Sequence, residues 1–457
     1  MKKEDDQKRA QVPHPRNRVT WALFACVPLF GALLLATPAE AAVPLESAYV
    51  FNSLLFLIGG FLVMWMAAGF CMLEAGLVRS KNVADICLKN ISLYSIAGVM
   101  YFLVGYNLMY TGVDGGWIGS FALWSPGESA ADEVIKLAKD NGDPGYANAS
   151  DWFFQMVFVA TAASIVSGTV AERIKLFPFF LFVAVLTGLI YPIQGAWKWG
   201  EGWLHLAGFQ DFAGSTLVHS TGGWAALVGA IIVGPRLGKY GPNGRVTPLP
   251  GSNLPLATLG TFILWMGWFG FNGASQLALG SAKDAVAVAQ VFANSNMAAA
   301  GGVLVAVGLT KLLYKKVDLT MALNGALGGL VSITAEPLAP SIGQAILIGG
   351  FGSALVVFVV PLLDRIRIDD VVGAIPVHLI CGIWGTLAVP LTNSDASFLT
   401  QLAGIGAVAA FVTTASALLW LALKYTVGVR LDRREEASGS DVAELGLEAY
   451  PEFSRGL

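Results

Sequence analysis

The chain has 457 residues, of which 55% are hydrophobic and only 13% are charged. This composition excludes an ordinary soluble globular protein and indicates an integral membrane protein. The net charge of -3 adds little. The four cysteines lack metal-ligand spacing, and the motifs GxxxxGK[ST], HExxH and GxSxG are absent. We therefore predict a protein that is not an enzyme, with no cofactor, no bound metal and no nucleic-acid partner.

The first 41 residues have the pattern of a signal peptide. Arg16 and Arg18 precede an apolar run at 21–36, and Thr-Pro-Ala-Glu-Ala follows it. A basic flank, a short apolar core and small residues at the end are typical of a cleaved signal peptide. An uncleaved extra span is the alternative. We predict a signal peptide at 1–41, a membrane domain at 42–426 and a cytoplasmic tail at 427–457.

Eleven further apolar stretches are each long enough to cross a bilayer of about 30 Å as a helix. They lie near residues 50–75, 84–106, 151–170, 177–196, 211–234, 256–275, 288–309, 319–335, 341–363, 371–391 and 399–423. With the mature N-terminus outside, sixteen lysines and arginines fall in the inner loops and at 424–434, against four in outer loops. The predicted fold is an all-α integral membrane protein with eleven transmembrane helices, N-out and C-in.

Short sequence motifs recur in the same order in both halves of this membrane domain. Trp-Met at 65–66 returns at 265–266, and Val-Ser-Gly-Thr-Val-Ala-Glu at 166–172 is echoed at 331–336. The fifth and tenth spans share a Val-His frame. Two five-helix repeats follow from this order, and the odd helix number makes the second copy inverted. Functional residues should meet between the two halves, and the eleventh helix stands outside the repeat.

Two histidines lie near the middle of predicted spans. His219 is placed about 12 Å below Asp211, and His378 lies at a similar depth in the tenth span. A polar ring is costly in lipid, so each should face protein or a pore. A neutral imidazole has one donor and one acceptor nitrogen. In contact, the pair could pass a small polar molecule or relay a proton; the alternative is two unrelated interhelical hydrogen bonds.

Aromatic residues gather at predicted outer helix ends. Trp199 and Ser275 end the fourth and sixth spans, Phe158 lies near the outer end of the third, and Phe271 lies in the sixth. Aromatic faces with a hydroxyl can bind a small cation, although an interfacial aromatic belt gives the same pattern. Asp211 fits a helix N-cap or an acid at a cation-attracting mouth, and the two roles are compatible.

Several motifs in this order resemble the ammonium transporters of the Amt/Mep/Rh family, and most closely the bacterial Amt type. They are Gly-Leu-Val-Arg-Ser-Lys-Asn at 76–82, Ala-Glu-Arg-Ile at 171–174, Asp-Phe-Ala-Gly-Ser-Thr-Leu-Val-His at 211–219, Gly-Trp-Phe-Gly-Phe-Asn at 267–272 and Val-His-Leu-Ile-Cys-Gly at 377–382. The resemblance covers almost the whole mature chain. It implies a homotrimer in membrane lipid, in which each subunit has its own pore between the inverted repeats.

The resemblance also implies residue roles. His219 and His378 are expected as twin pore histidines. Phe158, Trp199 and Ser275 are expected as the outer ammonium-binding site, with Asp211 as the acid near the entrance. Phe158 and Phe271 are expected as a phenylalanine gate.

The implied function is a transporter or channel that moves ammonium into the cell across the bacterial inner membrane, as ammonia plus a proton or as ammonia alone. Methylammonium would serve as an analogue. The tail at 439–450 resembles the family's regulatory C-terminus, which docks beneath the pores and in bacterial members often meets a PII-type signalling protein. A free solvated tail is the alternative, and an ammonium sensor that signals through the tail is the alternative function.

One departure concerns the segment before the second histidine. Relatives often have a further acid there and a glycine two residues ahead of that histidine. In this chain Asp369 and Asp370 are present, but Gly373 and Pro376 occupy these places. Because proline removes a backbone donor and can kink a helix, we expect an altered cytoplasmic vestibule.

Overall fold

Helices make up all the regular structure in the residues that the computed structural model describes, which are 44–139 and 144–453. The predicted signal peptide at 1–41 lies outside them. The α-helices are α2 (Leu45–Leu77), α3 (Val83–Met100), α4 (Tyr106–Tyr110), α5 (Ala130–Lys139), α6 (Asn148–Thr169), α7 (Leu176–Val185), α8 (Tyr191–Ala196), α9 (Trp203–Leu206), α10 (Thr221–Val233), α11 (Leu254–Ala274), α12 (Ala282–Tyr314), α13 (Leu319–Ile333), α14 (Ile342–Arg365), α15 (Cys381–Ala388), α16 (Phe398–Thr426) and α17 (Arg433–Ser438).

Short π-helical and 3₁₀ segments extend or join these helices. The π-helical segments are η2 (Tyr101–Gly105), η3 (Leu186–Ile190), η4 (Ser215–Ser220), η6 (Ile375–Ile380) and η8 (Asp441–Leu445). The 3₁₀ segments are η1 (Ser80–Asn82), η5 (Pro242–Gly244), η7 (Val389–Leu391) and η9 (Pro451–Phe453). Two of the π-helical segments, η4 and η6, hold the predicted pore histidines.

Nine helices in the described part of the chain are long and apolar enough to cross a membrane. Two shorter apolar helices, Leu319–Ile333 and Ile375–Leu391, stand where the eighth and tenth spans were predicted. The first begins at residue 319 as predicted, because the Asp318 carboxylate accepts backbone hydrogen bonds and caps the helix, and it ends at Ile333. Every predicted span thus overlaps an apolar helix, while the total of eleven spans and their orientation stay predictions.

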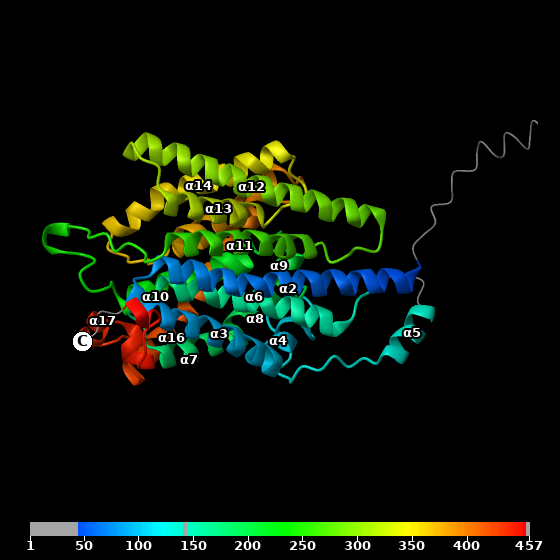
Figure 1. Ribbon diagram of the computed structural model, residues 1–457. Coiled ribbons are helices and arrows are strands. Elements are labelled where there is room, and N and C mark those ends of the chain that lie inside the picture. Colours follow the sequence, from blue (N-terminus) through cyan, green and yellow to red (C-terminus); the bar gives the residue numbers. More distant parts are fainter. Residues whose placement is uncertain (1–43, 140–143, 454–457) are drawn as a thin grey trace, which may run out of the picture. The chain divides into compact units, whose positions relative to one another are not determined.

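Helices α2 and α11, the first and sixth predicted spans, pack along each other (Figure 1). Small residues permit this close approach. A Cβ atom added at Gly76 would overlap backbone atoms of α11, and one added at Gly260 would overlap backbone atoms of α2. Backbones that approach so closely gain van der Waals contact, which drives helix association in lipid. The pairing brings the two predicted repeats into contact.

The C-terminal tail is docked on the helix bundle and not free. The Ser440 backbone N–H donates to Asn82 Oδ1 over 2.9 Å, and the Leu431 N–H donates to the Arg173 carbonyl over 3.0 Å. The side chains of Glu436 and Asp441 are buried. Because the tail makes hydrogen bonds to segments far away in sequence, it belongs to the folded unit. We call the end of the bundle that carries it the tail face.

Four charged side chains form an ionic network at the tail face: Arg79, Glu172, Arg236 and Asp369. Arg236 Nε and Nη2 donate to the two carboxylate oxygens of Asp369, each over 2.9 Å. Glu172 accepts the Arg79 backbone N–H over 2.8 Å, and its φ of 69° lies in the left-handed region. Burial by itself raises the pKa of Asp369, but the hydrogen bonds and charge of Arg236 outweigh it and hold this pKa well below its usual range.

Candidate functional site

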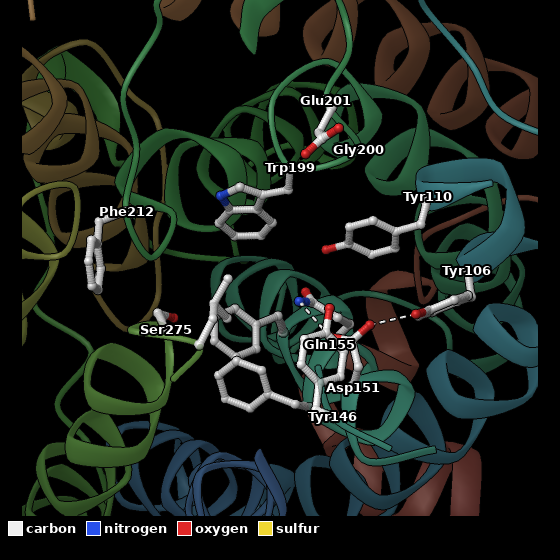
Figure 2. Close-up of a pocket in the computed structure, with 13 residues that line it drawn as sticks. Tyr106, Tyr110, Tyr146, Asp151, Gln155, Trp199, Gly200, Glu201, Phe212 and Ser275 are labelled. Atoms are coloured by element: carbon white, nitrogen blue, oxygen red, sulfur yellow. Dashed lines mark hydrogen bonds between the residues drawn. The ribbon is translucent and has the colours of Figure 1, made fainter. Parts of the chain in front are cut away.

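A cavity of about 390 Å³ opens beside the N-terminal half of α6 (Figure 2). The tail contacts Arg173, which follows the other end of this helix. We call it the Trp199 cavity. It is lined by Tyr106, Tyr110, Tyr146, Asp151, Phe154, Gln155, Phe158, Trp199, Gly200, Glu201, Phe212, Ser275 and Leu277. Three residues that the sequence assigned to one site, Phe158, Trp199 and Ser275, therefore do line one cavity.

Hydrogen bonds fix the polar atoms of these residues. Trp199 Nε1 donates to the Asp211 carbonyl over 3.0 Å, and Ser275 Oγ donates to the Phe271 carbonyl over 2.7 Å. The rings of Phe158 and Trp199 meet edge to face with centroids 6.1 Å apart. Because the indole N–H is occupied, the ring face of Trp199 is what it can offer to a cation.

Sequence reasoning missed a polar cluster on the wall of the same cavity. Asp151 is buried; it accepts the Tyr106 hydroxyl over 2.5 Å and the Gln155 side-chain amide over 3.3 Å, as the dashed lines of Figure 2 mark. The Tyr110 hydroxyl points into the cavity and has no hydrogen-bond partner among the described residues. The spacing 151, 155, 158 places three side chains on one face of a helix. That spacing was the available signal.

The Trp199 cavity is closed by two phenylalanines. The rings of Phe158 and Phe271 are stacked with centroids 4.0 Å apart and an interplanar angle of 25°. Both side chains are fully buried. Phe271 continues the row inward, because its centroid lies 5.2 Å from that of His219. The two stacked rings therefore connect the wall of the Trp199 cavity to His219.

The two predicted pore histidines are in contact. His219 Nδ1 and His378 Nδ1 lie 3.2 Å apart, and the ring centroids are 5.2 Å apart. Since an imidazole nitrogen either donates or accepts, one Nδ1 carries the shared proton and the other accepts it. His219 Nε2 is buried without a hydrogen-bond partner among the described residues. The pair is thus a proton-sharing unit with a free polar atom.

Both histidines end the same nine-residue motif, Asp-x-x-Gly-x-x-x-Val-His, at 211–219 and at 370–378. Gly214 and Gly373 have φ angles of 108° and 82°, a backbone conformation that residues other than glycine rarely adopt. Each motif then enters a π-helical segment, a feature frequent at functional sites. The sequence prediction used only the Val-His part of this repeat, although the whole motif was visible.

The aspartate that opens each motif caps the segment with the histidine. The Asp211 carboxylate accepts backbone N–H groups of residues 214–217 over 2.8–3.1 Å. Asp370 accepts the Ile375 N–H over 2.7 Å. Asp211 is buried and does not line the Trp199 cavity. Asp211 thus satisfies the free N–H groups of the first turn although the N-cap position itself is Gly214, and the hypothesis that Asp211 also attracts cations stays a prediction.

Pro376 occupies the second position of η6, where the first turn of a helix needs no backbone N–H. It therefore begins this segment without interrupting it. Gly373 supplies the left-handed turn just before it. The departure noted in the sequence thus forms a regular helix start, and its influence on a vestibule stays a prediction.

Two cavities follow on the other side of the histidine pair. The first, which we call the inner pocket, measures about 10 Å³ and is lined by Phe70, Leu73, Glu74, Ser164, Ile165, Gly168, Asn324, Leu327, Val372, Gly373, Ala374, Val377 and His378. The second, the tail-side cavity, measures about 390 Å³ and shares Asn324, Val372 and Gly373 with the inner pocket. Cavity, phenylalanine pair, histidine pair and inner cavities thus form one row through the bundle.

Comparisons with known proteins agree with this architecture. The model of the Ammonium Transporter Family matches residues 54–450. The chain is 39% identical to ammonium transporter Amt2 of Archaeoglobus fulgidus, with 87% of each chain covered. It is 40% identical to putative ammonium transporter sll1017 of Synechocystis sp., with 88% of this chain and 89% of the relative covered. A solved structure described as Sensor Amt Protein superposes with a TM-score of 0.80 at 34% identity and covers 87% of this chain and 99% of its own. This chain is a multi-pass membrane protein that belongs to the ammonium transporter family.

Proposed function

We propose that the chain conducts ammonium along the row from the Trp199 cavity to the tail-side cavity, as ammonia plus a proton or as ammonia alone. The observation that carries the proposal is the contact of His219 with His378, 3.2 Å between Nδ1 atoms that come from the two copies of one motif. Such a pair inside an otherwise apolar row suits a neutral molecule that makes hydrogen bonds, and it suits a proton.

Recruitment of the cation takes place at the Trp199 cavity. The ring faces of Phe158 and Trp199 attract a desolvated cation by roughly 0.5–2 kcal/mol, and the Ser275 side chain lies at the same wall. Asp151 adds a buried carboxylate to this wall. The aromatic faces and the negative charge together raise the local concentration of small cations at the phenylalanine pair.

Selectivity arises at the phenylalanine pair and the histidines. A bare ion loses its hydration in an apolar constriction, which is costly. Potassium has no way to avoid this cost, whereas ammonium can release a proton and continue as ammonia. The free Nε2 of His219 can then exchange hydrogen bonds with ammonia. The proton either follows along the histidine pair or stays behind.

Solid-supported-membrane current recording on proteoliposomes tests this proposal with pulses of ammonium, methylammonium and potassium. We expect a response to the first two and none to potassium above that of protein-free liposomes. A transient current indicates that charge accompanies the ammonia, whereas an internal pH change without current indicates ammonia alone. A potassium current as large as the ammonium current would refute the assignment.

A sensor is the second candidate, favoured by the docked tail and by the likeness to the Sensor Amt Protein structure. In that case ammonium binding changes how the tail is held. Methylammonium uptake in cells that lack other carriers separates the two functions, because a pure sensor gives no uptake. Homotrimer formation, a cytoplasmic tail and a PII-type partner stay predictions from the sequence, as does the bacterial inner membrane as the location.

A further inference from the structure

We propose that Glu74 takes up the proton that leaves the histidine pair on its tail side and hands it back to the cargo. This inference rests on the proposed function and adds a residue to it. Glu74 lies in the last turn of α2 and is 1% exposed. It lines the inner pocket together with His378, so a carboxylate and an imidazole face one small space.

One carboxylate oxygen of Glu74 is held and the other is free. Oε2 accepts the Ser167 hydroxyl over 2.7 Å and the Asn90 side-chain amide over 3.2 Å. Oε1 is buried and has no hydrogen-bond partner among the described residues. A structural role in tying α2 to α3 and α6 needs only Oε2. A purely structural role would therefore leave Oε1 buried without a partner, at a desolvation cost of about 1–3 kcal/mol.

The neighbouring lysine does not neutralise Glu74 by direct contact. Lys89 Nζ donates to the Ser167 carbonyl over 3.0 Å and lies 5.3 Å from the ring centroid of Phe179. The ion pairs of the described residues do not include Glu74. A proton or a cation that reaches Oε1 would therefore offset the cost of this buried oxygen.

The inner pocket has the size that such a transfer needs. Its volume of about 10 Å³ is close to the room for one water-sized molecule. Phe70, one turn before Glu74, packs against His378 with centroids 6.0 Å apart and keeps the wall apolar. Because the pocket shares Asn324, Val372 and Gly373 with the tail-side cavity, a molecule leaving Glu74 enters that larger space.

The transfer balances without any further reagent. An N–H bond of protonated His378 breaks, an O–H bond forms at Glu74, and the imidazole becomes neutral again. When ammonia reaches the inner pocket, the O–H bond breaks and an N–H bond forms. Ammonium then leaves through the tail-side cavity, and Glu74 is a carboxylate once more.

The test is Glu74→Gln, in which the amide oxygen can still accept from Ser167 and Asn90 while no group remains to take the proton. In proteoliposomes we expect the ammonium current to fall at least about tenfold, because a positioned acid–base group contributes that much or more. The ammonia flux, measured as the uptake of labelled methylammonium, should stay within about twofold. Glu46→Gln is the matched control, an exposed glutamate at the other end of the same helix, and it should leave both readouts unchanged.

Ser167→Ala separates the proton-transfer role from a structural one. It removes the 2.7 Å hydrogen bond to Oε2 but keeps the carboxylate, so the proposal predicts a retained current. The proposal is overturned if Ser167→Ala loses the current as Glu74→Gln does. It is equally overturned if Glu74→Gln keeps the wild-type current or loses current and ammonia flux together. Failure of the proposed function differs from all of these, because the wild-type protein itself would then give no response to ammonium.

Discussion

The histidine pair and the ionic network both bury ionisable side chains, yet they pair them in different ways. His219 and His378 face each other through one shared proton, and the rings of Phe271 and Trp268 pack against His219. In the network every carboxylate has an arginine partner, as the two 2.9 Å bonds between Arg236 and Asp369 show. The first arrangement leaves polar atoms free for a passing molecule, and the second leaves almost none.

The difference indicates that the ionic network stabilises the fold and that the histidine pair serves transport. A buried pair of opposite charges with good geometry holds two segments in one arrangement, and removing one partner is strongly destabilising. A neutral pair with a free nitrogen stabilises less but can change its hydrogen bonds at low cost. We therefore expect substitutions in the network to act on stability and substitutions in the row to act on transport.

The largest effect should come from Asp369→Asn, which leaves the buried Arg236 without its bidentate partner. We expect a loss of about 3–5 kcal/mol of stability, read as a lower unfolding temperature in detergent. Asp395→Asn in an exposed loop is the control and should change little. An unfolding temperature equal to that of the wild type would show that the network does not stabilise the fold.

The double variant His219→Ala, His378→Ala should change transport more than stability. Without the histidine pair the row loses these polar groups, and a cost of about 1–3 kcal/mol for an unmet hydrogen bond corresponds to a fall in ammonium current of roughly five- to 150-fold. His205→Ala, which removes an exposed histidine, serves as the control. Unchanged current and unchanged selectivity over potassium would show that the row is not the path.

Acid should weaken the network through Asp369. Its pKa in the folded protein lies below the unfolded value of about 3.9. The stabilisation it contributes is therefore complete above about pH 4 and is lost as the pH falls below that value, by up to about 1.4 kcal/mol per pH unit. Unfolding temperatures measured at pH 3, 4, 5 and 7 check this. In Asp369→Asn this part of the acid sensitivity should disappear; an identical pH profile in both proteins would contradict the assignment.

The smallest effect should come from Trp199→Leu in the outer cavity. Loss of one cation–π contact of about 0.5–1 kcal/mol corresponds to a roughly two- to fivefold weaker apparent affinity for ammonium. The maximal current should stay close to that of the wild type. Trp65→Leu, at a tryptophan that is 51% exposed, should leave the affinity unchanged. If both variants behaved alike, the aromatic wall would have no part in recruitment.

Near neighbours in sequence were sufficient to predict the helices and the candidate residues. Each apolar stretch predicted from hydropathy and length overlaps an apolar helix of the described residues, and the motifs around His219 and His378 identified the family. The same sequence left open whether the tail docks and whether Asp211 caps a helix. The hydrogen bonds of Ser440 and of the Asp211 carboxylate answer both questions.

Contacts between distant segments needed the tertiary structure. His219 and His378 are 159 positions apart, and only the packing of the two halves brings their rings together. Asp151 on the outer cavity wall and Glu74 beside the inner pocket carry no motif that marks them, because their importance comes from which oxygen is satisfied and which faces a cavity. Residue type and near neighbours are enough to predict which stretches are apolar and helical, since these properties are local. Tertiary structure alone decided which polar atoms meet, since that depends on how the helices are placed against one another.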